Sequence, residues 1–372
     1  MPRYDTASTV KPHTEAKLQF YTRYLERYLE ILLRAKPVEK INIYDMFCGE
    51  GIYSDGNTGS AVRAVDAIWK AEISNQLSKP INLHLNDLDE GKVAKLKSIL
   101  KKRQSNDKNF EITYSSYEAF YLLDGLVNLF EKQDKTVRNL IFIDPYGYKS
   151  INRDVLEAIM NNGKSEIILF LPIEQMYRFR NMTIDEVVDV SYRPLKEFVE
   201  QFKLDVLSIK SEKEFIHSFS QALVFNDSLY SASYAIKNHT GHYYGMFFIT
   251  KNLLGLEKII EVKWSLDTQE GEGFSERNQQ DFFLEAEKQS SLEEELRRSL
   301  DASDRSNIDL YKFVLTLGFL PKHANQIFRK WQQEGILEVL DLEKGRDARK
   351  GTFKLNFKDS QSGKPLLKFS LR

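Results

Sequence analysis

The chain has 372 residues, of which 42% are hydrophobic and 29% charged, with 24 Phe and 18 Tyr. This composition excludes a disordered protein and fits one large or two smaller soluble domains. A single cysteine, Cys48, excludes a disulfide framework and a cysteine-built metal centre, and we predict no metal site. No apolar run is long enough to span a bilayer, so we expect a cytoplasmic protein with no membrane partner.

The charge is balanced overall but unevenly spread. The 53 Lys and Arg are matched by 54 Asp and Glu. Residues 304–372 hold 14 basic against 8 acidic residues, a net +6, whereas residues 1–303 hold 39 against 46, a net −7. A polyanionic partner such as DNA or RNA is therefore expected at the C-terminal segment.

Along the chain, the hydrophobic pattern first predicts an amphipathic helix in residues 13–36. Short apolar runs then alternate with helical patterns, and the expected strands are residues 40–47, 81–87, 110–116, 139–147 and 166–173. This alternation predicts a parallel sheet that binds ligands at the carboxyl ends of its strands. Two alternating aromatic runs, 229–238 and 243–252, predict an antiparallel hairpin on the sheet edge. The strand series is typical of the α/β, methyltransferase-like Rossmann fold.

The C-terminal segment has a different pattern. Helices are expected in residues 307–318 and 321–335, followed by strands at 336–342 and 352–357 around a basic loop. This order is that of a winged helix. We therefore expect four segments: an N-terminal helix in 1–35 that packs on the main domain, a methyltransferase-like domain in 36–268, an acidic linker in 269–303 and a winged-helix-like domain in 304–372.

The sequence "DMFCGEGIY" follows the first expected strand. Asp45 ends that strand, and Gly49 and Gly51 allow the backbone to turn tightly beside a ligand. A nicotinamide-binding fingerprint would require a third glycine at position 54, where this chain has Ser54. Dinucleotide binding is therefore the weaker interpretation. In methyltransferases the corresponding loop holds the amino-acid end of S-adenosylmethionine, but the motif also fits an ordinary strand-to-loop turn.

Two further strand ends supply candidate cofactor ligands. Asp87, or alternatively Asp89, could accept the ribose hydroxyls, and either could instead cap the next helix. After the third strand, Ser115 or Ser116 stands where an acid often contacts the adenine amino group. Recognition of adenine is therefore less defined than recognition of the ribose.

The sequence "FIDPYG" ends the fourth strand. It resembles the Asp-Pro-Pro-Tyr turn of adenine-methylating enzymes, in which the acid and a carbonyl accept amino hydrogens and the ring stacks on a flipped base. Asp144, Pro145 and Tyr146 are accordingly the candidate catalytic residues. The second proline is absent, and a strand-ending turn with a packed tyrosine is the alternative.

Residues 11–275 resemble the three-Cys-motif partner (TcmP) family. Its pattern around the glycine loop is matched by Asp45, Phe47, Gly49, Gly51, Tyr53, Asp55, Gly56, Gly59 and Ser60. Its acidic step matches Asp87 and Asp89, and its Asp-Pro-aromatic-Gly turn matches residues 142–147. The chain departs from the family at Cys48, Glu50 and Glu90.

The resemblance implies a bacterial, methyltransferase-like protein that often accompanies a three-Cys-motif protein in settings of mobile elements and phage defence. It adds Phe47 and Tyr53 to the cofactor-binding set of Asp45, Gly49, Gly51, Asp87 and Ser116. It does not establish a reaction.

The winged-helix segment supplies candidate nucleic-acid contacts. An inward stripe on the second helix leaves polar and basic side chains outside, and the wing adds more. The candidates are Lys322, Asn325, Gln326, Arg329, Lys330, Lys344, Arg346, Arg349 and Lys350. We thus expect an S-adenosylmethionine-dependent methyltransferase acting on an exocyclic amino group of nucleic acid. The alternative is a non-catalytic, cofactor-binding adaptor or sensor for a three-Cys-motif partner.

Overall fold

A computed structural model describes residues 9–75, 78–103, 109–185, 189–268, 271–275 and 283–372. Residues 1–8 of the expected N-terminal segment, and residues 269–270 and 276–282 of the expected linker, lie outside the described residues. The chain forms two compact units. The sheet unit comprises residues 1–251 and 273–277, and the C-terminal unit comprises residues 252–272 and 278–372.

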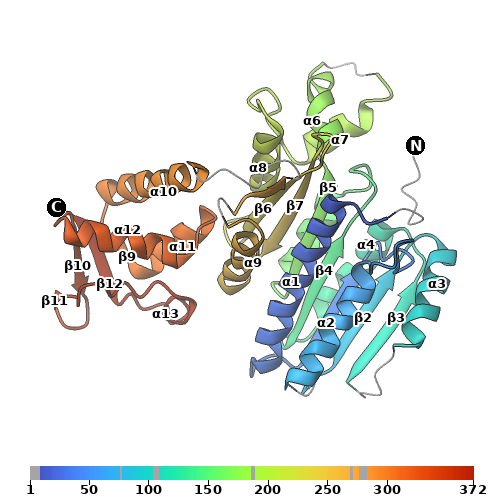
Figure 1. Ribbon diagram of the computed structural model, residues 1–372, viewed down its shortest axis with the longest axis horizontal. Helices are drawn as coiled ribbons and strands as arrows, with labels where there is room; N and C mark the ends of the chain where they lie inside the picture. The colour runs from blue at the N-terminus through green and yellow to red at the C-terminus, as the bar shows by residue number, and fades with distance from the viewer. Residues whose placement is uncertain (1–8, 76–77, 104–108, 186–188, 269–270, 276–282) are drawn as a thin grey trace. The chain divides into compact units, whose positions relative to one another are not determined.

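The sheet unit is built on one eight-stranded sheet in the order β3-β2-β1-β4-β5-β7-β6-β8 (Figure 1). Its strands are β1 (Lys40–Asp45), β2 (Ile81–Asn86), β3 (Phe110–Ser115), β4 (Val137–Ile143), β5 (Ser165–Pro172), β6 (Tyr230–Lys237), β7 (Tyr243–Thr250) and β8 (Gly273–Ser275). Strands β1 to β5 are parallel, and β7 lies antiparallel between β5 and β6. All five predicted parallel strands are present.

The predicted hairpin of β6 and β7 forms, but it is not the edge of the sheet. Strand β8 pairs in parallel with β6 through Ala235 and Gly273 and so covers the outer side of β6. Residues 273–275 were expected in a linker, where their polar composition gave no strand signal. Edge strands can be as short as this because only one neighbour pairs with them.

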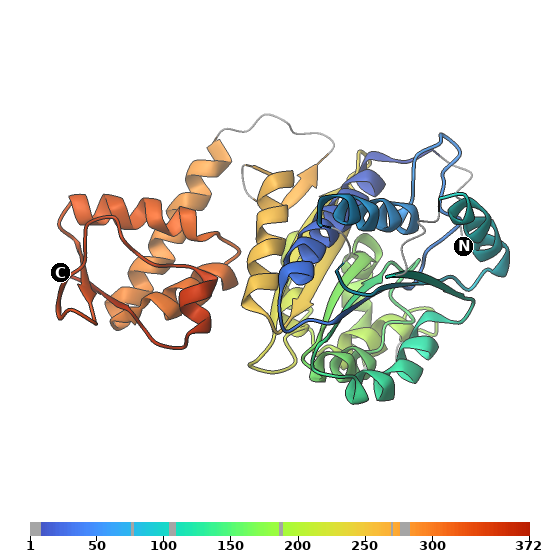
Figure 2. The same ribbon diagram turned by 90° about the horizontal axis from the view of Figure 1, so that it is seen from below.

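Helices cover both faces of the sheet (Figure 2). On one face lie α1 (Pro12–Arg34), α2 (Ser60–Asn75) and α3 (Glu90–Lys101), and on the other α4 (Ala119–Lys132), α5 (Arg153–Asn161), α7 (Arg193–Gln201) and α8 (Glu212–Ala222). The short α6 (Glu174–Phe179) and the 3-10 helix η1 (Arg180–Thr183) follow β5. Because both faces are covered, the central strands β1, β4 and β5 are buried almost throughout.

The C-terminal unit contains a four-stranded sheet in the order β11-β10-β12-β9. Its strands are β9 (Arg305–Ser306), β10 (Leu337–Asp341), β11 (Arg346–Asp347) and β12 (Leu367–Leu371). Its helices are α9 (Leu253–Leu266), α10 (Phe283–Ala302), α11 (Asn307–Thr316), α12 (Pro321–Gln333) and α13 (Phe357–Gln361). The helices expected at 307–318 and 321–335 are thus present, and Pro321 takes the first helical position as predicted.

The predicted second wing strand at 352–357 is wrong. Phe353 and Leu355 are buried in alternation, as in a strand, but Lys354 between them has a left-handed φ of 50°. That residue interrupts an extended backbone, and residues 357–361 form α13 instead. The long antiparallel partner of β10 is β12, through pairs such as Val339 with Phe369.

The expected linker is also partly structured. In α10, Leu292, Leu296 and Leu300 are buried at helical spacing. The indole Nε1 of Trp331 on α12 donates to Glu293 of α10 at 2.7 Å. The second half of α10 is therefore part of the C-terminal unit's core, and its acidic residues lie on its outer side and at this contact.

Candidate cofactor and acceptor site

The sheet register brings three predicted acids to one edge. Asp45, the last residue of β1, lies opposite Leu85 of β2 and Phe142 of β4. Asp87 and Asp144 each follow two residues later, so all three stand at the carboxyl ends of neighbouring parallel strands. This is where open parallel sheets bind ligands, and the structure brings together the three motifs that the sequence held 42 and 57 positions apart.

The two glycines of the loop have different roles. Both have left-handed φ angles, +61° at Gly49 and +87° at Gly51, which favour glycine over any other residue. A Cβ at Gly51 would lie 2.5 Å from Leu96 Cδ1 and 3.1 Å from Val62 Cγ2, so this glycine lets the loop pack on α2 and α3. A Cβ at Gly49 would meet nothing within 4 Å. Gly49 therefore faces open space that a ligand can fill.

Asp45 is fully buried, and its carboxylate is incompletely hydrogen bonded. Oδ1 accepts the Phe47 amide at 3.3 Å, whereas Oδ2 has no partner. Burial raises the pKa of Asp45 to about 7, although the nearby Ser60 side chain and the Phe47 amide oppose the shift, and the charges of Asp144 and Asp87 add to it. A buried, unpartnered carboxylate oxygen fits a cationic ligand group such as an α-ammonium.

Asp87 and Asp89 have separate tasks. Asp87 is buried, and its two oxygens accept the amides of Gly49 at 3.1 Å and Asp89 at 3.0 Å. Asp89 is the N-cap of α3 and accepts the amides of Gly91 and Lys92. The capping alternative thus applies to Asp89. Asp87 ties the glycine loop to the end of β2, and its remaining lone pairs are suited to ribose hydroxyls.

The end of β3 is organised by a residue that the sequence argument missed. Asn86 is buried; its Oδ1 accepts from the Ser115 hydroxyl at 2.8 Å and the Tyr117 amide at 3.0 Å. Its Nδ2 donates to the carbonyls of Met46 and Tyr117. Since Ser115 is used in this way, Ser116, which is half-buried, is the better placed of the two serines to meet adenine.

The candidate catalytic acid has an unexpected partner. Lys17 of α1 donates from Nζ to Asp144 Oδ2 at 2.5 Å, and the two side chains are only 11% and 20% exposed. The same ammonium lies 4.7 Å from the centre of the Phe170 ring on β5. Burial alone would lower the pKa of Lys17, but the Asp144 carboxylate raises it above its ordinary value. Lys17 is therefore charged.

A sequence signal for Lys17 existed. His13, Lys17, Tyr21, Tyr24 and Tyr28 recur at helical spacing, and all five are buried. A lysine on the inward stripe of a helix is rare unless it is paired. The signal was missed because its partner is 127 positions away.

Helix α1 is fixed against this site by several contacts. Arg63 of α2 donates two hydrogen bonds to the Glu15 carboxylate, at 3.1 and 2.6 Å. The ring of Tyr21 stacks on Phe142 with centroids 4.3 Å apart. Tyr53 is half-buried in the loop after Gly51. It is close enough to Lys17 and Asp144 for their charges to act on its pKa, which burial raises. These contacts fix α1 against α2 and β4, and they thereby fix the position of Lys17 on α1.

Pro145 and Tyr146 complete the predicted turn. Pro145 is buried, whereas the Tyr146 side chain is 61% exposed. The Tyr146 hydroxyl accepts from Lys92 of α3 at 3.0 Å. The alternative of a packed tyrosine is therefore wrong, and the ring is available for stacking. Phe47, by contrast, packs against the hydrophobic core.

Helix α12 of the C-terminal unit presents a polar stripe. His323, Ala324, Ile327, Phe328 and Trp331 are buried, and the exposed side chains include Lys322, Gln326, Arg329 and Gln333. The wing residues Lys344, Arg346, Arg349 and Lys350 are exposed as well. Gln332 accepts the Gly351 amide at 2.9 Å and ties the wing to α12.

Two of the residues on α12 that we predicted to contact nucleic acid, Lys330 and Asn325, have a different environment from the exposed side chains above. Lys330 forms an ion pair with Glu293 of α10 at 3.0 Å, so its charge is neutralised within the unit. Asn325 is half-buried, and its Oδ1 is buried without a partner. The pairing of Lys330 depends on the position of α10, which the sequence pattern had indicated to be a linker.

The strand order 3-2-1-4-5-7-6, with β7 antiparallel and acids at the carboxyl edge, defines a methyltransferase-like Rossmann fold joined to a winged helix. The GMT-like wHTH domain family matches residues 268–343, which are 76 of the 372 residues. This match confirms the predicted winged helix and includes much of the expected linker. No curated protein matches the chain.

Three solved structures of methyltransferases are similar to this chain at low identity. The O-methyltransferase from Bacillus cereus in complex with SAH is 14% identical, with 67% of this chain and 84% of that chain covered and a TM-score of 0.34. The type I restriction-modification methyltransferase subunit from Streptococcus thermophilus is 9% identical, with 64% of this chain and 44% of that chain covered and a TM-score of 0.32. The SAH-bound methyltransferase PaMTH1 from Podospora anserina is 10% identical, with 65% of this chain and 89% of that chain covered and a TM-score of 0.28. These likenesses are too distant to transfer a ligand or a reaction.

In the described part of the chain no helix is long and apolar enough to cross a membrane.

Proposed function

We propose that the protein is a cytoplasmic, S-adenosylmethionine-dependent methyltransferase that acts on an exocyclic amino group of nucleic acid. The observation that carries the proposal is the set of Asp45, Asp87 and Asp144 at one sheet edge, beside a glycine loop that leaves open space at Gly49.

The residues present fit the cofactor. The unpartnered Oδ2 of Asp45 would pair with the α-ammonium group, and backbone amides near Gly49 would meet the carboxylate. Asp87 would accept the ribose hydroxyls, and Ser116 and the exposed Leu88 would flank the adenine, with Tyr53 near the reacting end. When bound, S-adenosylmethionine supplies a methyl group activated by a sulfonium.

The acceptor would lie at Asp144. Its Oδ1 and the Pro145 carbonyl would accept the two amino hydrogens and so aim the nitrogen lone pair, while Tyr146 stacks on the base. Lys17 fixes the position of the Asp144 side chain through Oδ2. Its ammonium has further donors, which suit a ring nitrogen beside the amino group, as in adenine or cytosine.

The C-terminal unit supports nucleic acid as the substrate class. The exposed side chains of Lys322, Gln326 and Arg329 on α12, with those of the wing, are of the kind that contact phosphates and base edges. Measured on the full chain with labelled duplex DNA and RNA, Lys322→Ala/Arg329→Ala should weaken binding and reduce its salt dependence. Lys330→Ala should change both less, because Glu293 already neutralises Lys330. Equal effects would contradict this assignment.

A finer assignment follows from the sequence resemblance. We propose that the protein is a TcmP-type protein that works with a three-Cys-motif partner in a bacterial phage-defence or mobile-element setting. The match of nine positions around the glycine loop, from Asp45 to Ser60, supports this proposal.

A non-catalytic adaptor or sensor that binds the same cofactor is the second candidate. It is favoured by the ion pair of Lys17 with Asp144, which already engages one of the two carboxylate oxygens of Asp144, and by serine in place of the third-strand acid. Calorimetry with S-adenosylmethionine is the first test, because no binding to the folded protein sinks both candidates. If it binds, methyl incorporation into DNA, RNA or protein, absent in Asp144→Ala, decides for the enzyme.

A further inference from the structure

The carboxyl edge of the sheet unit carries exposed tyrosines. Among the described residues, three tyrosines are more than half exposed: Tyr117 at 55%, Tyr121 at 73% and Tyr146 at 61%. Tyr117 and Tyr121 follow β3, and Tyr146 follows β4. Leu88, after β2, is 69% exposed between them. Large exposed side chains that gather at one edge mark an interaction surface more often than scattered ones do.

The backbone of this surface is held by polar anchors. Asn86 binds both the amide and the carbonyl of Tyr117, at 3.0 and 2.9 Å. The Tyr121 amide donates to Glu118 at 2.7 Å, at the start of α4. Tyr117 is therefore presented from an ordered turn and Tyr121 from the first turn of α4, although their exposed rings do not contribute to the core.

Lysines of α3 lie beside the tyrosines. Lys92 Nζ is 3.0 Å from the Tyr146 hydroxyl and 5.5 Å from its ring centre. Lys95 pairs with Glu50 of the glycine loop at 2.6 Å, and Lys97 lies over the Tyr114 ring. Residues 90–103 hold six basic side chains against the single acid Glu90. The nearby Asp89 and Glu118 are helix caps.

We propose that this rim, formed by Tyr117, Tyr121, Tyr146 and Lys92, binds single-stranded nucleic acid. Bases stack on the tyrosines and a phosphate pairs with Lys92, the combination of aromatic and basic side chains that single-strand sites use. Strands β3 and β4 are three positions apart in the sheet, so the two ends of the rim are separated by roughly 14 Å, a span of a few nucleotides. A duplex hides its base faces and does not fit.

This proposal deepens the proposed function, because it makes the substrate single-stranded and places the nucleotides that flank the acceptor. The test uses the full chain and a fluorescein-labelled single-stranded DNA 20-mer, with the matching duplex as comparison, in fluorescence anisotropy. Binding is measured in the wild type and again in the Lys322→Ala/Arg329→Ala background, so that the C-terminal unit does not mask the rim.

Tyr117→Ala/Tyr121→Ala should lower single-strand affinity about tenfold or more, since stacking contributes roughly 1–3 kcal/mol per base, and leave duplex affinity unchanged. Tyr117→Phe/Tyr121→Phe keeps the rings and should bind as the wild type does. Leu207→Ala, at a side chain 72% exposed outside the rim, controls for loss of exposed apolar surface. All three positions are exposed, so none of these variants should unfold the protein.

The proposal is overturned if the alanine pair binds single strands as tightly as the wild type, if the phenylalanine pair is as weak as the alanine pair, or if the wild type binds no single strand. Its failure is distinct from that of the proposed function. Binding of S-adenosylmethionine without single-strand binding overturns the rim alone, and single-strand binding without the cofactor overturns the reaction alone.

Discussion

Lys17 near the start of α1 and Asp144 at the end of β4 are joined by an ion pair of 2.5 Å between Nζ and Oδ2. Helix α1 precedes the first strand of the sheet. The pair therefore brings a charged side chain from this N-terminal helix into the candidate acceptor site. Because two partly desolvated charges are costly to assemble and far more costly to separate, the pair constrains both the stability of the sheet unit and its chemistry.

Lys17→Met should destabilise the protein by about 3 kcal/mol, the lower end of the range for a broken buried pair, since both groups keep some exposure. Adding Asp144→Asn should recover part of the loss, because no unpaired carboxylate is then left. Urea unfolding of the two single variants and the double variant gives the coupling energy, which we expect to exceed about 1 kcal/mol.

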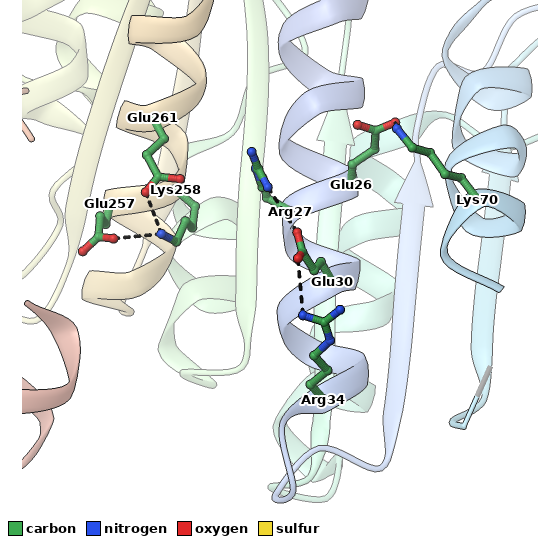
Figure 3. A network of polar contacts seen from close by, with 8 residues as sticks. All are labelled: Glu26, Arg27, Glu30, Arg34, Lys70, Glu257, Lys258 and Glu261. Carbon is green, nitrogen blue, oxygen red and sulfur yellow. Dashed lines mark hydrogen bonds and ion pairs between the residues drawn. The ribbon is translucent and has the colours of Figure 1, made fainter. Parts of the chain in front are cut away.

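The matched control is the pair of Lys70 and Glu26, whose contact is drawn in Figure 3 (2.8 Å, side chains 68% and 35% exposed). It should couple by less than about 1 kcal/mol. Similar coupling in the two pairs would show that burial adds nothing to the Lys17 contact.

Binding of S-adenosylmethionine should depend on pH through Asp45. Its pKa of about 7 means that the carboxyl is largely protonated below pH 7 in the free protein, whereas the ammonium group requires the carboxylate. Affinity should therefore fall by up to about tenfold per pH unit as the pH is lowered below 7, with proton release on binding. Calorimetry in buffers of different ionisation enthalpy measures both.

Asp45→Asn is the control, since it keeps the titration of the ligand's own amine and removes that of Asp45. A pH profile unchanged by this substitution would contradict the assigned role. Protein stability should depend on pH in the opposite direction to cofactor affinity. Because the native pKa of Asp45 lies above its unfolded value, the contribution of Asp45 to stability is present at acid pH and is lost as the pH rises through about 7.

The two loop glycines should respond differently to alanine. Gly51→Ala places a Cβ against Leu96 and Val62 in addition to the cost of about 1–2 kcal/mol for a left-handed alanine. Gly49→Ala adds no steric contact, so its only cost in stability is that of an alanine in the left-handed conformation. We therefore expect a larger fall in melting temperature for Gly51→Ala, and a loss of cofactor affinity without further destabilisation for Gly49→Ala. Equal losses of stability would show that Gly49 is also a packing position.

Leu296→Ala should show that α10 belongs to the C-terminal core. The side chain is completely buried, so its truncation should cost about 2–5 kcal/mol. Arg298→Ala, two residues on and 70% exposed at its side chain, should cost less than about 0.5 kcal/mol. Thermal unfolding followed by tryptophan emission, to which Trp331 beside α10 contributes, measures both effects. Equal small effects would support the linker interpretation.

The sequence predicted what depends on local pattern. The five parallel strands, the antiparallel pair and the two helices of the winged helix follow from hydrophobic period and turn residues. Asp45, Asp87 and Asp144 could be placed together because parallel strands end at a common edge. The role of Asp89 as the N-cap of α3 was one of the two alternatives that the sequence left open, and it is a local feature.

Only the tertiary structure decided which distant groups meet. Lys17 reaches Asp144 because α1 crosses the end of β4, Lys330 is neutralised because α10 packs on α12, and β8 covers the hairpin that was expected at the edge. The reason is physical: helix and strand periodicity is set by neighbours in the chain, whereas ion pairs and edge pairing depend on side chains more than thirty residues apart, which no local pattern encodes.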